Sequence, residues 1–265
     1  MVSVQYSKAQ NAIHSHFHDS HQLIYVVKGR ARVTVSGREY LAKTGTLVLI
    51  SRLESHEIQI ETDDYSRYTV LIDPDVTRYS GLLGERLFSL LVNRPEQFRH
   101  AMDLSAQPQV QQILAQMASE KDGPMADQML LFLLGQLLVL CCRAYPAQVP
   151  ENTRNLELIQ CIQRYLEENV SQRLTMGALV KRFHMSQSYL SHLFKDIAGC
   201  SVMGYLTAYR LQLAKGYLAQ TDWEVSRIVE TCGFSDNSNF SRTFKKITGL
   251  SPSEFRKQYQ KERGL

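Results

Sequence analysis

The residues SYLSHLFK at positions 188–195 and SNFSRTFK at positions 238–245 are two copies of one pattern, 50 residues apart. The copies share two serines and a Phe-Lys pair, and both are followed by an isoleucine and a glycine. Apolar residues that recur three and four positions apart predict a helix with one buried face. The C-terminal part of the chain is therefore expected to contain a repeated helical unit.

A shorter helix is expected before each copy, because apolar residues recur there at helical spacing. They are Met176, Leu179, Val180 and Phe183 in the first copy and Val225, Ile228, Val229 and Cys232 in the second. Thr175 and Ser186 are expected to cap the first pair of helices. The second turn is one residue longer, and Gly233 in it can adopt a left-handed backbone angle. Helices joined by such short turns cross steeply, so we predict helix-turn-helix units at about 175–196 and 224–247.

The polar face of each second helix carries groups that suit double-stranded DNA. Arginine can bind guanine and asparagine can bind adenine, while flanking lysines suit phosphates. A helical solenoid is the alternative, but solenoids need at least three repeats of ~33–47 residues. We therefore expect DNA contacts from Gln187, Ser188, Ser191, His192 and Lys195 in the first copy, and from Asn237, Ser238, Ser241, Arg242 and Lys245 in the second.

Positive charge is concentrated in the same part of the chain. Residues 151–265 carry 16 Lys and Arg against 11 Asp and Glu, whereas residues 1–150 carry 14 against 15. The five cysteines show no CxxC spacing, and the N-terminus has no signal-peptide pattern. The longest apolar stretch, residues 129–142, is shorter than the ~20 residues that span a bilayer. We expect a cytoplasmic protein that binds a polyanion and no membrane.

The second unit also carries a family signature: CGFSD at residues 232–236, NFSR at residues 239–242, FKK at residues 244–246, and Ser251-Pro252. Residues 156–258 resemble the DNA-binding domain of the AraC/XylS family of bacterial transcription regulators. The sequence departs from the family at Val180 and Val229, where alanine is usual, and at Asn239, where an aromatic residue is common.

The resemblance implies several further features. Residues 210–214 would belong to a linker helix that fixes the separation of the two recognition helices. Activation through RNA polymerase, binding to direct repeats as a homodimer, and a cupin-like N-terminal ligand domain are also implied. Base contacts would come from Ser188, Ser191 and His192 in the first unit and from Ser238, Asn239, Ser241 and Arg242 in the second.

Residues 1–80 are expected to form a cupin-like β-barrel. Apolar or alternating runs predict strands at residues 23–27, 32–36, 38–42, 47–50 and 68–72. Residues 81–146 switch to helical spacing and predict a helical pair, and residues 147–155 read as a linker. The second helix of the pair is apolar on nearly every side, so we expect it to pack on a partner subunit or on the β domain, and we favour the dimer. The fold class is α+β with two or more domains.

Five of the eight histidines lie within residues 14–56. His14, His16 and His18 alternate and would share one face of a strand. Together with His56, the HxH pair resembles the metal-binding motifs of cupins, but Gln22 stands where those motifs have a carboxylate. We expect His16, His18, Gln22 and His56 to bind a small ligand, such as a sugar through its hydroxyls; zinc or iron on the three histidines, or a structural role, is the alternative.

These patterns predict a DNA-binding transcription regulator, an activator that senses a small molecule such as a sugar. No nucleophile–base arrangement and no phosphate-binding loop occurs in the sequence, which argues against an enzyme and a cofactor. The alternative function is a cupin metal enzyme with an appended DNA-binding domain.

Overall fold

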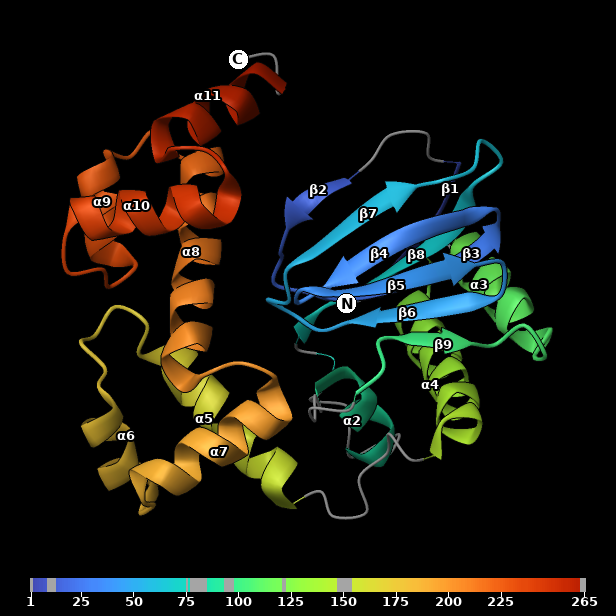
Figure 1. The fold of residues 1–265 in the computed structure, drawn as a ribbon, viewed down its shortest axis with the longest axis horizontal. Helices are drawn as coiled ribbons and strands as arrows, with labels where there is room; N and C mark the ends of the chain where they lie inside the picture. The colour runs from blue at the N-terminus through green and yellow to red at the C-terminus, as the bar shows by residue number, and fades with distance from the viewer. Residues whose placement is uncertain are drawn as a thin grey trace. The chain divides into compact units, whose positions relative to one another are not determined.

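A computed structural model describes residues 2–8, 13–74, 76, 85–92, 98–120, 123–146 and 154–262. The chain divides into two compact units, residues 1–156 and 157–265, which are described one at a time. The N-terminal unit combines β-sheets with helices, and the C-terminal unit is helical (Figure 1). This arrangement confirms the α+β fold class.

The strands of the N-terminal unit form two antiparallel sheets. One has five strands in the order β1-β8-β3-β6-β9, and the other has four in the order β2-β7-β4-β5. The expected strands correspond to β3, β4, β5, β6 and β8. The bounds are Val2–Lys8 (β1), Ile13–His16 (β2), His21–Lys28 (β3), Arg30–Val35 (β4), Arg38–Lys43 (β5), Thr46–Ile50 (β6), His56–Ile60 (β7), Ser66–Ile72 (β8) and Ala101–Asp103 (β9).

The two sheets enclose an aliphatic core, as a flattened barrel does. Val26 and Ile50 of the five-stranded sheet and Val33 and Ile58 of the four-stranded sheet are buried in this one cluster. Inward-facing residues alternate along β7, where His56 and Ile58 are buried and Gln59 is exposed. His56 therefore shares the inner face of its strand with the core.

Three helices pack on the other face of the five-stranded sheet: Glu85–Val92 (α2), Gln109–Ser119 (α3) and Ala126–Ala144 (α4) (Figure 1). The apolar face expected of α3 is confirmed, since Val110, Ile113, Leu114 and Met117 are all buried. One difference from the sequence-based expectation is β9, which returns from this region to pair with β6. Three residues are too few to show a strand periodicity.

The helix α4 is long and apolar enough to cross a membrane by length and composition alone. Leu134, Leu137 and Leu138 on one side of it are fully buried against the sheet. On another side Met129 and Phe132 are 43% and 55% exposed. Hence α4 is a core helix of the N-terminal unit that leaves an apolar strip uncovered.

The C-terminal unit is built from seven described helices. Their bounds are Arg154–Glu168 (α5), Met176–Phe183 (α6), Gln187–Ala198 (α7), Val202–Gln220 (α8), Val225–Thr231 (α9), Asn237–Thr248 (α10) and Pro252–Glu262 (α11). The central helix α8 runs between two helix pairs, α6–α7 and α9–α10 (Figure 1). Residues 147–153 of the expected linker lie outside the described residues, and residues 154 and 155 belong to α5.

Candidate functional site

The first helix-turn-helix unit consists of α6 and α7. Thr175 accepts a hydrogen bond from the Ala178 amide and Ser186 accepts one from the Tyr189 amide, each over 3.2 Å, so both predicted caps are confirmed. The turn contains His184, which has a left-handed backbone with φ of 53°. Leu190 and Phe194 are fully buried beneath α7. The opposite face of α7 is left to solvent.

The second unit consists of α9 and α10, with Asp236 as the cap of α10. Its carboxylate accepts a 2.7 Å hydrogen bond from the Asn239 amide, which lowers the pKa of Asp236. Gly233 takes the left-handed conformation at φ of 74°, as expected from the sequence. A Cβ at this position would collide with the carbonyl oxygen of Val170 and with the Arg210 guanidinium. Glycine is therefore required here for both backbone and space.

The helix α8 connects the two units by packing on each of them. Near its start, Tyr205 packs edge-on against Phe194 of α7, with ring centres 5.7 Å apart. Further along, Arg210 donates from Nε to the Val170 carbonyl at 3.0 Å and from Nη2 to the Gln172 carbonyl at 2.7 Å. The Val170 carbonyl is also the atom that Gly233 approaches. A single helix thus fixes both recognition helices within one compact body.

The side chains expected to contact DNA lie on the solvent side of α7 and α10. Phe240 and Phe244 are fully buried beneath α10. Asn239 is partly engaged within its own helix, since its Oδ1 accepts a 3.4 Å hydrogen bond from Thr243. Ser241 is partly buried, and the other predicted contacts are exposed: Gln187, Ser188, Ser191, His192, Lys195, Asn237, Ser238, Asn239, Arg242 and Lys245.

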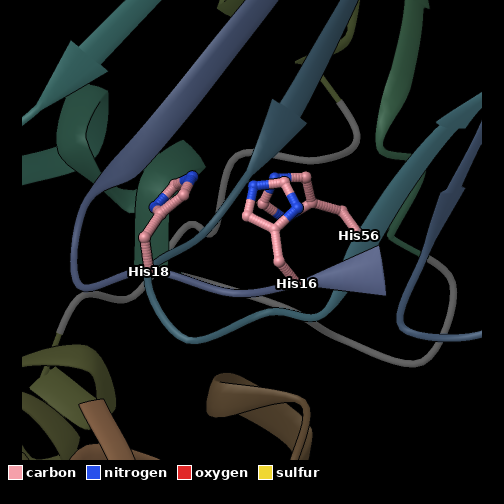
Figure 2. Close-up of side chains that lie close together, drawn as sticks. All are labelled: His16, His18 and His56. Atoms are coloured by element: carbon pink, nitrogen blue, oxygen red, sulfur yellow. The ribbon is translucent and has the colours of Figure 1, made fainter. Parts of the chain in front are cut away.

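The N-terminal unit brings together three of the predicted ligand-binding histidines, His16, His18 and His56 (Figure 2). His16 on β2 lies directly opposite His56 on β7 in the antiparallel pair. His18 comes from the loop after β2 and points into the same volume. One nitrogen of each ring lies within 4.8 Å of the others. The side chain of His14 lies outside the described residues.

His56 is the most deeply buried member of this histidine cluster, with 2% of its surface exposed. Burial lowers its pKa to about 4, and the neighbouring His16 and His18 add to that shift against the opposing hydrogen bond to Glu54. Its Nδ1 lies 3.0 Å from the Glu54 carbonyl oxygen, so Nδ1 carries the proton. Its buried Nε2 has no hydrogen-bond partner. Nε2 of His56, on the buried side of the cluster, therefore has a lone pair that accepts no hydrogen bond.

Gln22 completes the predicted set and lies next to His18. The Oε1 atom of Gln22 is 3.2 Å from Nε2 of His18, and Nδ1 of His18 is 3.0 Å from the Ser20 carbonyl. An amide oxygen only accepts, so Nε2 of His18 donates in its hydrogen bond to Gln22. The structure thus assembles His16, His18, Gln22 and His56 at one end of the aliphatic core.

A chain of buried polar groups leads away from the histidine cluster. The Glu54 carboxylate accepts a 2.6 Å hydrogen bond from the Ser51 amide and lies 3.2 Å from Nε2 of His100. Ser51 Oγ donates to the Leu91 carbonyl of α2 at 2.6 Å. Glu54 is also the residue whose carbonyl faces His56. The site is connected in this way to a helix outside the barrel.

Two family models match separate parts of the chain. The model of an AraC-like ligand binding domain matches residues 4–135, and that of a helix-turn-helix domain matches residues 179–258. The chain belongs to the AraC family of transcription regulators. The match assigns ligand binding to the N-terminal unit of this AraC-family regulator and DNA binding to its C-terminal unit.

Curated relatives of this AraC-family chain cover different shares of its length. The transcriptional activator RhaS of Citrobacter koseri is 27% identical over 261 residues, which are 96% of this chain and 91% of the relative. The uncharacterised regulator YijO of Escherichia coli is 32% identical over 156 residues, or 58% of this chain and 55% of YijO. Both names describe transcriptional regulators.

The solved structure of ToxT from Vibrio cholerae has the same fold. It superposes with a TM-score of 0.66 at 12% identity over 97% of each chain. ToxT has also been solved with an unsaturated fatty acid bound, with a TM-score of 0.66 and 14% identity over 97% of this chain and 94% of ToxT. At this identity the likeness concerns the fold of the AraC-family chain and not its ligand.

Sequence reasoning missed some features of both sites. Tyr189 is 50% exposed on α7, directly after Ser188. It lies outside the buried set of Leu190, Leu193 and Phe194, but it was not included among the expected DNA contacts. The partners of Glu54 were also missed, because His100 lies 46 residues further along the chain. No local pattern links residues so far apart.

Proposed function

We propose that this AraC-family chain is a transcription activator whose DNA binding responds to a small molecule held by its N-terminal unit. The observation that carries the proposal is the pair of capped, outward-facing helices α7 and α10 held by α8. Each helix has a buried apolar side and an exposed side of hydroxyl, amide, imidazole and cationic groups. Such groups recognise base edges and phosphates in the major groove.

The two recognition helices read two successive major grooves in this proposal, because helix-turn-helix half-sites are spaced by about 34 Å along DNA. Their contact sets differ, with His192 in the first and Arg242 in the second. The DNA site of one chain is therefore asymmetric. In this proposal a dimer binds two such sites as direct repeats. Activation proceeds through RNA polymerase, and activation rather than repression is supported by the name of RhaS as an activator.

The effector site in this proposal is the end of the barrel that carries His16, His18, Gln22 and His56. Imidazole and amide groups at the edge of an aliphatic core suit a ligand with hydroxyls on a partly apolar frame. A sugar is the class of ligand that we propose to test first. We assign the protein a cytoplasmic, non-catalytic role.

Dimerisation in this proposal uses the uncovered apolar strip of α4. Met129 and Phe132 of α4 are 43% and 55% exposed and lie one helical turn apart, and Met125, the left-handed residue just before α4, is 67% exposed. Two such helices packed antiparallel would cover each other's strips, as in a symmetric interface.

A promoter-binding measurement tests the proposal. Fluorescence anisotropy with fragments from upstream of the chain's own gene should give nanomolar binding that weakens steeply with salt. A panel of sugars should then include one that changes this affinity or the amount of transcript made by added RNA polymerase. Equal affinity for every DNA sequence at physiological salt would contradict the proposal.

A further inference from the structure

We infer that His16, His18 and His56 bind one divalent transition-metal ion, with Zn²⁺ the best match. The inference deepens the proposed effector site, on which it rests for its role in sensing, by naming the chemistry of its first ligand. Three imidazoles with an open fourth position form a donor set that holds zinc in proteins. The fourth coordination position of the ion would then be open to an oxygen atom of an effector or of water.

The spacing of the three rings fits one ion. A zinc-bound imidazole nitrogen lies about 2.0–2.1 Å from the metal, which places the ring centre about 3.2 Å away and two tetrahedrally arranged ring centres about 5 Å apart. The observed centres are 4.3 Å apart for His16 and His56, 5.0 Å for His18 and His56, and 5.8 Å for His16 and His18. One nitrogen of each ring lies within 4.8 Å of the others, and ring rotation must bring these nitrogens to about 3.3 Å from one another to share a tetrahedral ion.

The protonation pattern of the buried member also fits a metal ligand. Nδ1 of His56 faces the Glu54 carbonyl and so carries the proton, which leaves Nε2 deprotonated. That Nε2 is buried without a hydrogen-bond partner. A buried polar atom without a partner is costly, and a coordinated cation would satisfy it. A backbone carbonyl on the opposite ring nitrogen is the usual orienting contact of a metal-bound histidine.

His18 shares the backbone carbonyl contact on Nδ1, and a bound ion would replace the hydrogen bond that its Nε2 makes to Gln22. Its Nδ1 faces the Ser20 carbonyl, and its Nε2 lies 3.2 Å from Oε1 of Gln22. A separation of about 3.3 Å is expected between two atoms that share a tetrahedral metal with bonds of about 2.0 Å. Gln22 therefore lies beside the open position as a weak neutral ligand. A glutamate there would add the charge that the site lacks.

The polar groups next to His56 connect the proposed ion site to helix α2. Metal binding would fix the ring of His56 and, through its Nδ1, the Glu54 carbonyl. The Glu54 carboxylate holds the Ser51 amide, and Ser51 Oγ holds the Leu91 carbonyl of α2. Three hydrogen bonds, joined through the covalent structure of Glu54 and Ser51, thus connect the histidine cluster to α2.

Metal binding by the full chain, produced without a polyhistidine tag and stripped with a chelator, tests the inference. We expect one Zn²⁺ per chain by elemental analysis and calorimetry, and Co²⁺ should give the intense visible absorption of a tetrahedral site. His16→Ala should weaken Zn²⁺ binding at least 100-fold. His56→Ala should do the same, and circular dichroism will verify that both variants are folded. Absence of a stoichiometric ion from folded wild-type protein would overturn the inference.

Two further variants separate coordination from indirect effects. Gln22→Glu should tighten Zn²⁺ binding at least tenfold, because a carboxylate replaces a neutral amide beside the ion. His184→Asn, in the C-terminal unit, is the matched control and should bind as the wild type does. Equal losses in His184→Asn and His16→Ala, or no gain in Gln22→Glu, would count against the site. Promoter binding measured on the same stripped samples tests the proposed function separately, since specific DNA binding without any zinc site would remove only this inference.

Discussion

Arg210 of α8 and Val170, which follows α5, are joined by a 3.0 Å hydrogen bond from the guanidinium Nε to the backbone carbonyl. The same guanidinium holds the Gln172 carbonyl, and its partial burial lowers the pKa of Arg210. The second recognition unit approaches the chain at this point, because Gly233 lies against Val170 and Arg210. The contacts around Arg210 therefore help to set the separation of the two recognition helices.

Arg210→Met should destabilise the C-terminal unit by about 1–3 kcal/mol, because the partly buried Val170 carbonyl and the more exposed Gln172 carbonyl lose a charged donor while the aliphatic packing is kept. Trp223 is the single tryptophan of the chain and lies in this unit, so its fluorescence during urea unfolding reports the change. Arg173→Met is the control, since Arg173 is exposed, and should alter stability by less than about 0.5 kcal/mol. Similar losses in both variants would contradict this role of Arg210.

Gly233→Ala should destabilise the same unit by about 2 kcal/mol or more, because alanine disfavours the left-handed backbone at this position and its Cβ would collide with neighbouring atoms. Gly216→Ala is the matched substitution. Gly216 lies inside α8, and a Cβ there would meet nothing within 4 Å, so alanine should stabilise by about 0.5–1 kcal/mol. Opposite signs in thermal unfolding are expected, and a neutral Gly233→Ala would show that the turn is not constrained as described.

Arg242→Ala should cost about 1–3 kcal/mol in binding to the specific promoter site and relax the preference at one base position, if Arg242 binds guanine as proposed. Lys245→Ala should weaken binding to all sequences alike and reduce the dependence of log K on log salt by about one. Anisotropy titrations at several salt concentrations with systematically changed sites measure both effects. The proposed orientation of α10 is wrong if the two variants behave alike.

Phe132→Lys should convert a dimer to a monomer at micromolar concentration, because it places a charge in the middle of the exposed apolar strip of α4. Sedimentation velocity measures the change. Leu41→Lys is the control: Leu41 is 59% exposed on β5, outside the proposed interface, and its replacement should leave the dimer intact. A dimer that survives Phe132→Lys would exclude this use of α4.

Lys215 of α8 gives the C-terminal unit a defined pH dependence. Burial lowers its pKa to about 8 from 10.5. Between these values the unfolded chain keeps a proton that the folded chain has lost, so the contribution of Lys215 to stability rises with pH in this window and is least favourable below pH 8. Lys215→Met should be more stable than the wild type at pH 7, by at most about 3 kcal/mol, and the difference should shrink towards pH 10. A difference that grows with pH would contradict the shift.

Much of the C-terminal unit could be predicted from the sequence because its determinants are local. Helical spacing fixed the buried faces of α6 and α7, and the hydroxyls of Thr175 and Ser186 cap the helices that follow them directly. The left-handed turn at Gly233 was likewise predictable from the residue type. What the repeat did not predict is that His184 adopts the same left-handed conformation in the first unit, since only a small share of non-glycine residues do so.

The N-terminal unit was predicted less completely because its contacts are remote in sequence. The resemblance to cupin motifs grouped His16 and His18 with His56, and the structure shows that the pairing of β2 with β7 brings His56 opposite His16. The expectation that His18 shares a strand face with His16 was wrong, because β2 ends at His16 and His18 lies in the loop that follows. The pairing of β9 with β6 and the link from Glu54 to His100 depend on how separate strands align. Register between distant strands is set by the assembled core, and a single sequence does not display it.

Because α8 packs on both recognition units, it sets the distance between them and their relative rotation about its axis. Each residue of an α-helix contributes about 1.5 Å of length and about 100° of rotation. A one-residue insertion in the middle of α8 would therefore move the second unit only slightly along the axis and turn it to another side of that axis. Substitutions in α7 or α10 can change which bases are recognised. The length of α8, in contrast, sets the relative position and rotation of the two recognition helices on DNA. The spacing within the operator should therefore diverge far less freely than the operator sequence.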